Sequence, residues 1–526
     1  MRRVSRWMVA IVVCGLPLAM AAEECPARPA PGSVVNDPYS ISSQNGVLKA
    51  QFVMAHSVDQ QGYTHYCYKY NAGGQVMEAP TLRLNPGDQL DLDVLDRIDD
   101  KDAQKMKMHM EGAPGQVCGD SGDPTLNSTN VHFHGLNVPP VCHQDDVLTT
   151  LIQPGSAGFH YSIQIPTTEP PGLYWYHPHV HGFTEFQVNG GAAGAMVVEG
   201  MEKYRPEVKG LTERIFVIRQ QYLVPWVPGP YQLTVNYVTA PVLGVPPLIQ
   251  MQAGDREFWR VANASIQDFL QLQVVENERP KQLELVALDG YPLAQTRKET
   301  TILIPPAGRA EFIVQAPEAG KSAVFYTQAY STGPTGNADL AETLANIEVL
   351  SGAMAVPRQK AAVASAPAVA SSTPVLKFSD LGHQAVTAQR KLFFSEEFGG
   401  TNGPIQFYIT VDGQKQKVFE ANEKPVITTK VGAVEDWTIE NRALETHAFH
   451  IHQIHFQVLE VNGQPVTDND LRDTIEIPYW TGTGPYPSVK VRMDFRDPTI
   501  AGTFVFHCHI LLHEDLGMMH KILVEP

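Results

Sequence analysis

Three stretches of this sequence share one layout, and their spacing constrains the fold more than any other feature. Segments 81–96, 256–265 and 424–441 each run as an alternating apolar and polar stretch, a turn or short link, and a second alternating stretch. A period of two residues is typical of half-buried β-strands. Because the segments recur about every 170 residues, the sequence predicts three copies of one β-sandwich module.

Chain length and composition support the same domain organisation. A chain of 526 residues is too long for a single core, and its 41 glycines and 40 prolines favour turns and short strands. The stretch 355–374, "AVPRQKAAVASAPAVASSTP", is rich in Ala, Ser and Pro and is typical of an extended linker. We therefore predict an all-β fold with domains at 23–202, 203–354 and 375–526.

The histidines are the strongest functional signal. The chain has 19, and most lie in four groups: "VHFHG" (131–135), "WYHPHVHG" (175–182), "ETHAFHIHQIH" (445–455) and "FHCHILLHEDLGMMH" (506–520). Residues two apart on a strand share a face, so each group presents one pair of imidazoles on one side. Eight neutral imidazoles suit a cluster of copper ions and exceed what a zinc site would use. The pairs are His132 with His134, His177 with His179, His450 with His452, and His507 with His509.

The same alternation predicts a second metal site. Cys508 lies between two paired histidines, so its sulfur must project from the opposite face. His447 is three residues before His450 and also falls on that face, and a following loop can add His513 and Met518. Two imidazoles, one thiolate and a weak axial thioether make a blue-copper electron-transfer site. The two peptide links that flank Cys508 would then join the two centres covalently.

In this order, the four groups resemble the copper-binding motifs of the multicopper oxidases, including laccases. "HFHG", "WYHPH", "HAFHIH" and "HCHILLHEDLGM" correspond to the first to fourth motifs, and the likeness spans residues from about 60 to 526. Phe133 stands where the family often has Trp, and Ala448 where Pro is common, but neither is a ligand. The resemblance implies three cupredoxin-like Greek-key β-sandwich domains and four copper ions, with a trinuclear cluster between the first and third domains.

The resemblance also implies an allocation of ligands. The type 1 copper would take His447, Cys508, His513 and Met518; the type 2 copper would take His132 and His450; one type 3 copper would take His134, His177 and His509, and the other His179, His452 and His507. His181 and His455 are expected to support the cluster without binding copper.

Three acids are candidate catalytic residues. Glu514 and Asp515 directly follow a predicted ligand, and by resemblance Glu514 is a proton-relay candidate, with a structural salt bridge as the alternative. Glu445 lies two residues before His447, in the stretch where cuprous oxidases of the family often carry an acid and methionines. Here the stretch 441–447, "NRALETH", has the acid but no methionine, which favours organic donors. Asp145 or Asp146 could bring protons to the type 2 side, or could belong to an ordinary exposed loop.

The N-terminus predicts export. Arg2, Arg3 and Arg6 precede an apolar run from residue 7 to about 19, and small residues follow, so residues 1–22 are expected to be a signal peptide for a periplasmic or secreted protein, by either export route. No later stretch is long enough to span a membrane. The net charge of −17 disfavours nucleic acid and anionic membranes as partners.

An oxidising compartment permits disulfides. Without the signal peptide and the predicted ligand Cys508, four cysteines remain, and they allow three pairings. Cys25–Cys67 with Cys118–Cys142 is the preferred pairing, and free buried thiols are the alternative.

The predicted function is that of a laccase-like enzyme. It would act as a monomer and couple four one-electron oxidations of phenolic or aromatic-amine donors to reduction of O2 to water. Met518 as axial ligand resembles the lower-potential members, which favour readily oxidised donors. The alternative is a metallo-oxidase acting on Cu(I), or on Fe(II) or Mn(II) as less favoured donors, and the methionine-rich stretch 105–110 keeps it open. A copper-free binding relative is disfavoured because all the predicted ligands are present, and a two-domain nitrite reductase because of the chain length and the histidines flanking Cys508.

Overall fold

The computed structural model describes residues 24–58, 64–98, 118–222, 231–240, 244–350, 375–398, 405–467 and 470–526. The predicted signal peptide, the linker 355–374 and the methionine-rich stretch 105–110 lie outside the described residues. Among the described helices, none has the length and apolar character needed to cross a bilayer.

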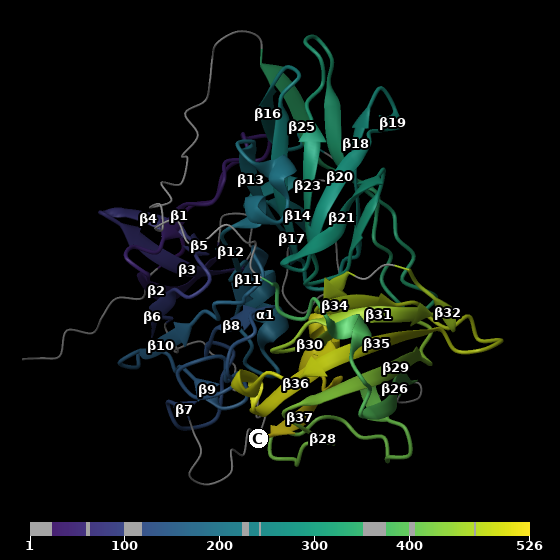
Figure 1. Ribbon diagram of the computed structural model, residues 1–526. Coiled ribbons are helices and arrows are strands. Elements are labelled where there is room, and N and C mark those ends of the chain that lie inside the picture. Colours follow the sequence, from purple (N-terminus) through teal and green to yellow (C-terminus); the bar gives the residue numbers. More distant parts are fainter. Residues whose placement is uncertain are drawn as a thin grey trace, which may run out of the picture.

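The described strands form three pairs of sheets, and each pair lies within one of the three predicted domains (Figure 1). A small parallel ladder of β7 (Cys118–Gly119) and β9 (Thr150–Leu151) lies below the first pair in Figure 1, and helix α1 (Thr184–Asn189) lies between the last two strands of this pair in the sequence. One sheet has the order β1 (Ser40–Ser42), β5 (Thr81–Leu84), β12 (Gly194–Val198), β11 (Gly172–His177) and β8 (His132–His134). The other has the order β10 (Phe159–Gln164), β6 (Gln89–Asp96), β2 (Val47–Val58), β3 (Thr64–Ala72) and β4 (Gln75–Glu78).

The second pair of sheets forms the middle domain, which is teal and green in Figure 1. One sheet has the order β15 (Val238–Ala240), β14 (Tyr231–Val235), β13 (Thr212–Tyr222), β17 (Arg256–Ala264), β23 (Arg309–Gln315), β20 (Leu283–Leu288) and β21 (Tyr291–Glu299). The other has the order β16 (Leu248–Gln252), β25 (Glu342–Leu350), β24 (Ala323–Gln328), β18 (Leu270–Glu276) and β19 (Arg279–Pro280), with β22 (Ile302–Ile304) beside β18. Short 3-10 turns at Met201–Lys203 and Pro206–Val208 precede it.

The third pair of sheets carries the C-terminal residues. One sheet has the order β27 (Ile405–Val411), β26 (Ala388–Phe398), β29 (Ala433–Asn441), β35 (Ser488–Phe495), β31 (Phe456–Val461) and β32 (Gln464–Pro465), with β33 (Leu471–Arg472) beside β31. The other has the order β28 (Ile427–Lys430), β37 (Met519–Glu525), β36 (Gly502–Cys508), β30 (His447–Ile451) and β34 (Thr474–Ile477). Helix α2 (Leu511–Asp515) follows β36, and 3-10 turns lie at Leu381–His383 and Pro498–Ile500.

A repeated detail explains why the sequence segments recur. In each domain an early strand pairs in parallel with the strand of the repeated segment: β2 with β6, β13 with β17, and β26 with β29. The second and third domains each bury a Trp, Trp259 or Trp437, whose indole N–H donates to a Glu two residues earlier. That Glu also pairs with an arginine of the parallel neighbour, Arg214 or Arg390. The predicted all-β cupredoxin-like fold is therefore confirmed, whereas the exact domain limits stay predictions.

Strands β11 and β12 are buried on both faces, which explains the continuous apolar run before the second histidine group. Tyr174 and Tyr176 point into the core of the first domain. Leu173 and Trp175 point the other way and pack against Ile215 and neighbouring residues of the middle domain. A strand that is buried on both sides has no polar face, so its sequence does not alternate.

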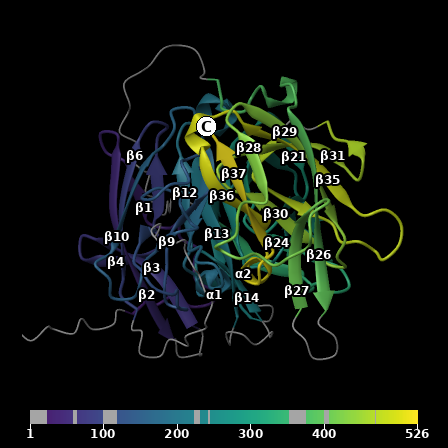
Figure 2. The ribbon, with the colours of Figure 1, turned by 90° about the horizontal axis from the view of Figure 1, so that it is seen from below.

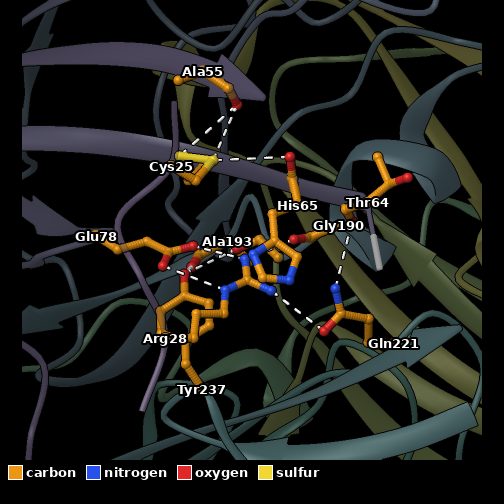
Figure 3. The surroundings of a disulfide bond; sticks show 12 residues. Cys25, Arg28, Ala55, Thr64, His65, Glu78, Gly190, Ala193, Gln221 and Tyr237 are labelled. Atoms are coloured by element: carbon orange, nitrogen blue, oxygen red, sulfur yellow. Dashed lines mark hydrogen bonds and ion pairs between the residues drawn. A yellow bond between two sulfur atoms is a disulfide. The ribbon is translucent and has the colours of Figure 1, made fainter. Parts of the chain in front are cut away.

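Both preferred disulfides are present: Cys25–Cys67 and Cys118–Cys142. Cys25 fixes the N-terminal segment to the first domain, and Figure 3 shows Arg28, three residues later, reaching Glu78. Arg28 also donates to the carbonyl of Gly190 and to Gln221 of β13. The N-terminal segment therefore ties the first domain to the middle domain.

Candidate metal centres

The smaller candidate centre forms where β36 ends. The Cys508 sulfur lies 3.5 Å from His447 Nδ1 and 3.9 Å from His513 Nδ1, and the two nitrogens lie 3.3 Å apart. All three side chains are buried. Two imidazole nitrogens and a sulfur that converge on one point form a donor set for a soft or borderline metal, and the combination of two histidines and one cysteine suits copper.

Two further residues enclose this donor set. Met518 is buried in the same apolar core as Cys508; its N–H donates to the His513 carbonyl at 2.8 Å, and its carbonyl accepts from the Cys508 N–H at 3.1 Å. The ring of Phe407 stacks on His513 with centroids 4.0 Å apart. The backbone bonds thus hold the Met518 loop against the cysteine, and Phe407 covers one face of an imidazole ligand.

The larger candidate centre gathers the eight paired imidazoles, all buried, between the first and third domains. Strands β8 and β11 pair so that His132 lies opposite His177, and β30 and β36 pair so that His450 lies opposite His507. Rings from the two domains then meet face to face: His132 stacks on His452, and His134 on His450, each at 3.9 Å between centroids. Two stretches far apart in the sequence, 132–179 and 450–509, therefore build one site.

The ring nitrogens show that this cluster suits metal ions. His507 Nε2 lies 3.2 Å from His452 Nε2 and 3.5 Å from His179 Nε2, so three like atoms face one another. Buried nitrogens of five other rings make no hydrogen bond: His132 Nε2, His134 Nδ1, His177 Nε2, His450 Nε2, and both nitrogens of His509. Bare, buried nitrogens are costly in a folded protein unless a cation binds them. The chemistry of the donors therefore fits copper.

The nitrogens fall into overlapping sets of three within binding distance of one another. The sets are His132, His450 and His452; His132, His134 and His177; and His179, His452 and His507. The last set equals one predicted type 3 group. In the other predicted type 3 group, the centroid of the His509 ring lies 5.2 Å from that of His134 and 5.5 Å from that of His177. The division of the rings among individual copper ions stays a prediction.

Cys508 faces away from the cluster, as strand alternation requires. Its sulfur contacts His447 and His513, whereas the neighbouring His507 contacts His179 and His452. One strand end thus contributes to both centres.

Burial sets the protonation of the cluster. It lowers the pKa of His132, His134 and His507 well below 6.5, and neighbouring imidazoles lower it further. The rings are therefore neutral at physiological pH, which metal binding requires. Burial also raises the pKa of the Cys508 thiol, so formation of the thiolate depends on a bound cation.

Glu514 lies behind the cluster, in helix α2. Its carboxylate oxygens lie 3.6 Å from His179 Nδ1 and 3.3 Å from His507 Nδ1, and Thr184 donates to it at 3.1 Å. Burial, with Asp515 close by, raises its pKa well above 4.5. The structure therefore places a buried acid that can hold a proton against two cluster rings.

Asp515 has a different environment. It accepts hydrogen bonds from the backbone N–H groups of Gly182, Thr184 and Glu185 at 2.9, 3.1 and 2.8 Å, and the last two are the first free donors of helix α1. These bonds fasten α1 of the first domain to α2 of the third, and the two helices lie side by side in Figure 2. The predicted catalytic role of Asp515 stays a prediction, and the contacts assign it a positioning role.

Asp145 is buried and contacts a different ring of the cluster, His132. Its oxygens are 3.0 and 3.1 Å from His132 Nδ1, and it accepts hydrogen bonds from the backbone N–H of Phe133 and from the side-chain amide of Gln453. Burial raises its pKa to about 7. Asp146 instead accepts hydrogen bonds from the backbone N–H groups of Leu148 and Thr149. Of the two candidates, only Asp145 contacts a predicted ligand.

Two carboxylates flank the outer edge of the Cys508 centre. Glu396 lies 3.4 Å from His447 Nε2, and Glu445 lies 3.6 Å from His513 Nε2. Burial, and then the proximity of Glu396, raise the pKa of Glu445 to about 8. The sequence singled out Glu445 by its position before His447, but Glu396, which lies 51 positions from His447, carried no motif.

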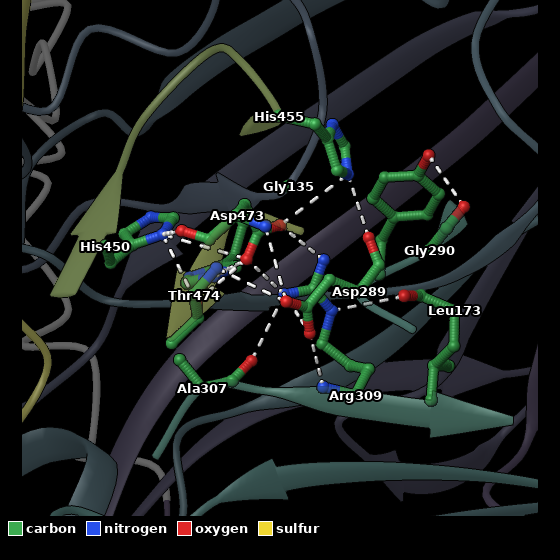
Figure 4. A network of polar contacts seen from close by, with 12 residues as sticks. Gly135, Leu173, Asp289, Gly290, Ala307, Arg309, His450, His455, Asp473 and Thr474 are labelled. Carbon is green, nitrogen blue, oxygen red and sulfur yellow. Dashed lines mark hydrogen bonds and ion pairs between the residues drawn. The ribbon is translucent and has the colours of Figure 1, made fainter. Parts of the chain in front are cut away.

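Asp473 is another residue that sequence reasoning missed. Figure 4 shows its contacts with His450, His455 and Arg309. Arg309 donates to both oxygens, at 2.7 and 2.5 Å, and His134 Nε2 lies 3.3 Å from one of them. Burial alone would raise the pKa of Asp473, but the arginine holds it below 3.8. Asp473 has no conspicuous spacing to a histidine motif, so no local signal could have found it.

The two supporting histidines differ. His455 Nε2 lies 2.9 Å from the Asp289 carbonyl and Nδ1 lies 3.3 Å from the Asn137 amide, so both of its nitrogens have protein partners. His181 packs edge-on against Phe419 at 4.9 Å. Among the described residues, neither histidine belongs to a group of side chains close enough together to bind one metal ion.

Comparison with known proteins agrees with this geometry. Three models of the multicopper oxidase family match residues 125–203, 213–352 and 399–526. A multicopper oxidase of Staphylococcus aureus is 23% identical over 503 residues, which cover 92% of this chain and 88% of that protein. A laccase of Bacillus subtilis is 24% identical over 406 residues, covering 69% of this chain and 72% of the laccase.

Solved structures share the fold. A Campylobacter jejuni multicopper oxidase described as a metallo-oxidase superposes with a TM-score of 0.67 at 22% identity, covering 95% of this chain and 96% of its own. McoA of Aquifex aeolicus gives 0.68 at 18% identity, covering 94% and 100%. With three matching family models and the two buried donor sets, this chain belongs to the multicopper oxidase family.

Proposed function

We propose that this protein is a laccase-like oxidase that withdraws electrons singly from phenolic or aromatic-amine donors and uses four of them to reduce O2 to water. The observation that carries the proposal is the end of β36. There the Cys508 sulfur joins His447 and His513 in one donor set, while His507 joins His179 and His452 in the other. A single peptide link separates an electron acceptor from an oxygen-reducing cluster.

Four copper ions are proposed, with the ligands that the motifs imply. His447, Cys508, His513 and Met518 would hold the type 1 ion, and the eight paired imidazoles would hold the type 2 ion and the type 3 pair. When bound, copper supplies one-electron acceptance at the first site and oxygen reduction at the second. The eight neutral rings leave the cluster cationic, which suits an electron-accepting site.

The surrounding acids have separate tasks. Glu514, against His179 and His507, holds a proton beside the place where oxygen is reduced, and Asp145 does the same beside His132. Asp515 binds α1 and so keeps His179 of the first domain in register with His507 of the third. Two buried acids thus contact different rings of the cluster, which matches the need of oxygen reduction for protons.

We place the enzyme outside the cytoplasm, in the periplasm or secreted, as a monomer. The signal-peptide pattern of residues 1–22 and the two disulfides support this location.

A second candidate function is oxidation of a metal ion, and Glu396 and Glu445 favour it. Both carboxylates lie at the outer edge of the type 1 histidines, 3.4 and 3.6 Å from the ring nitrogens that point away from Cys508. Such a pair would attract a cation to the point where electrons enter. A relative with the same fold is described as a metallo-oxidase.

The test compares donors on copper-loaded full-length protein. Oxygen consumption would be measured with dimethoxyphenol, Cu(I) and Fe(II), together with copper content and visible absorption. The proposal expects a blue protein with four copper ions that oxidises the phenol, and it fails if phenol oxidation is absent while copper is fully loaded. Glu445→Gln separates the two candidates, because it should impair cation oxidation much more than phenol oxidation.

A further inference from the structure

We propose that the middle domain, which carries none of the predicted copper ligands, orients the histidine cluster through the ion pair of Arg309 with Asp473. Arg309 comes from β23 of the middle domain, and Asp473 directly precedes β34 of the third. Both side chains are fully buried and joined by two hydrogen bonds, at 2.7 and 2.5 Å (Figure 4). The inference rests on the proposed function, since it concerns ligands of the proposed copper cluster.

Asp473 accepts hydrogen bonds from two cluster rings. Its carbonyl accepts from His450 Nδ1 at 2.8 Å, and its carboxylate accepts from His134 Nε2 at 3.3 Å. A neutral imidazole carries one N–H, so these bonds fix the tautomer of both rings. The opposite atoms, His450 Nε2 and His134 Nδ1, are the ones that lack a hydrogen-bond partner. Asp473 therefore directs the lone pairs of both rings toward the metal.

Arg309 in turn fixes Asp473. Its guanidinium also donates to the carbonyls of Leu173 and Ala307, both at 3.2 Å. The carboxylate of Asp289, in the middle domain, accepts hydrogen bonds from the backbone N–H of Arg309 at 2.8 Å and from the backbone N–H groups of Asp473 and Thr474 at 3.3 Å. Asp473 also lies within metal-binding distance of His134 and His450, but both of its oxygens are occupied by the arginine, which argues against direct metal binding.

Gly135 provides the room for this ion pair. A Cβ on this residue would lie 2.5 Å from Arg309 Nη2 and 2.8 Å from Asp473 Oδ2, and its φ of +92° is also strained for other residues. The glycine of "HFHG" thus lets the pair from the other two domains approach the residue directly after His134. All three domains meet at this point.

The experiment uses copper-loaded Asp473→Asn and Arg309→Lys, with Glu311→Gln as the matched control. Glu311 lies two residues from Arg309 on β23 and forms a buried ion pair with Arg260, but that pair contacts no cluster histidine. Asp473→Asn should weaken retention of cluster copper against a chelator by about 10- to 100-fold and alter the type 2 electron paramagnetic resonance spectrum, with the blue absorption retained. Arg309→Lys should cause the same change to a smaller extent, and Glu311→Gln should not.

Four outcomes separate the possibilities. Unchanged spectra and copper retention in Asp473→Asn overturn the inference, as does an equal loss in Glu311→Gln. If Asp473→Asn does not fold, Arg309→Lys decides alone, and an unaltered type 2 spectrum in that variant overturns the inference. A wild-type protein that binds no cluster copper would instead overturn the proposed function.

Discussion

Replacing Glu514 with Gln tests the proposed proton path most directly. The glutamate lies close to the Nδ1 atoms of two cluster rings and accepts a hydrogen bond from the Thr184 hydroxyl, yet it belongs to neither donor set. Gln keeps the shape but carries no exchangeable carboxyl proton. The variant therefore removes proton delivery and leaves the predicted ligands in place.

Two effects of different size are expected. In the wild type a carboxylate oxygen faces the ring Nδ1 as an acceptor, whereas the Gln amide can turn an N–H group toward the same nitrogen. One buried contact that is left unsatisfied in this way costs about 1–3 kcal/mol of stability. Loss of a positioned proton donor slows a proton-coupled step by about 10²- to 10⁴-fold. A chain of this size tolerates the first effect, so the second should dominate the phenotype.

The assay separates the two half-reactions. Anaerobic bleaching of the blue absorption by a phenol should proceed at the wild-type rate, whereas reoxidation by O2 should be slowed by the factor given above. Thr184→Val is the control, because it removes a hydrogen bond to Glu514 but leaves the carboxyl group. Equal slowing of both half-reactions, or reoxidation at the wild-type rate with copper fully bound, would refute the reasoning.

Three further predictions concern other parts of the molecule. Replacing Cys118 and Cys142 with Ser should lower the free energy of unfolding by about 3 kcal/mol, since the disulfide closes a loop of 24 residues, and urea denaturation measures it. Cys508→Ser should abolish the blue absorption while metal analysis still finds the cluster copper; a blue variant would contradict the assignment. Burial raises the pKa of Glu342 from 4.5 to about 8, so the stability it contributes is complete below pH 4.5 and is lost as pH rises through 8. Glu342→Gln should therefore reduce the loss of thermal stability between pH 5 and pH 9, and an unchanged difference would exclude this cause.

Much of the site could be predicted because its ligands follow local rules. Strand alternation places His507 and Cys508 on opposite faces, and this needs no knowledge of the tertiary structure. The repeated segments likewise predicted the sandwiches, since a period of two shows in a single strand.

The remaining residues could not be found by such rules. Arg309 and Asp473 are 164 positions apart, and their pairing depends on how two domains pack. Glu396 lies in β26, where nothing in the neighbouring sequence relates it to His447. Asp515 was predicted from its neighbour Glu514, but its oxygens turn toward the start of α1, a contact that only the tertiary structure determines.

The sequence separation between β36 and the first-domain histidines has a consequence for biogenesis. The stretch 507–518 supplies predicted ligands to both centres, whereas the first-domain histidines lie at 132–179, so neither donor set is complete until residues 507–518 have been synthesised. A chain that stops before residue 507 has half-built sites, with the first-domain imidazoles lacking some of their counterparts. Topology alone thus delays completion of both centres until the third domain has been made.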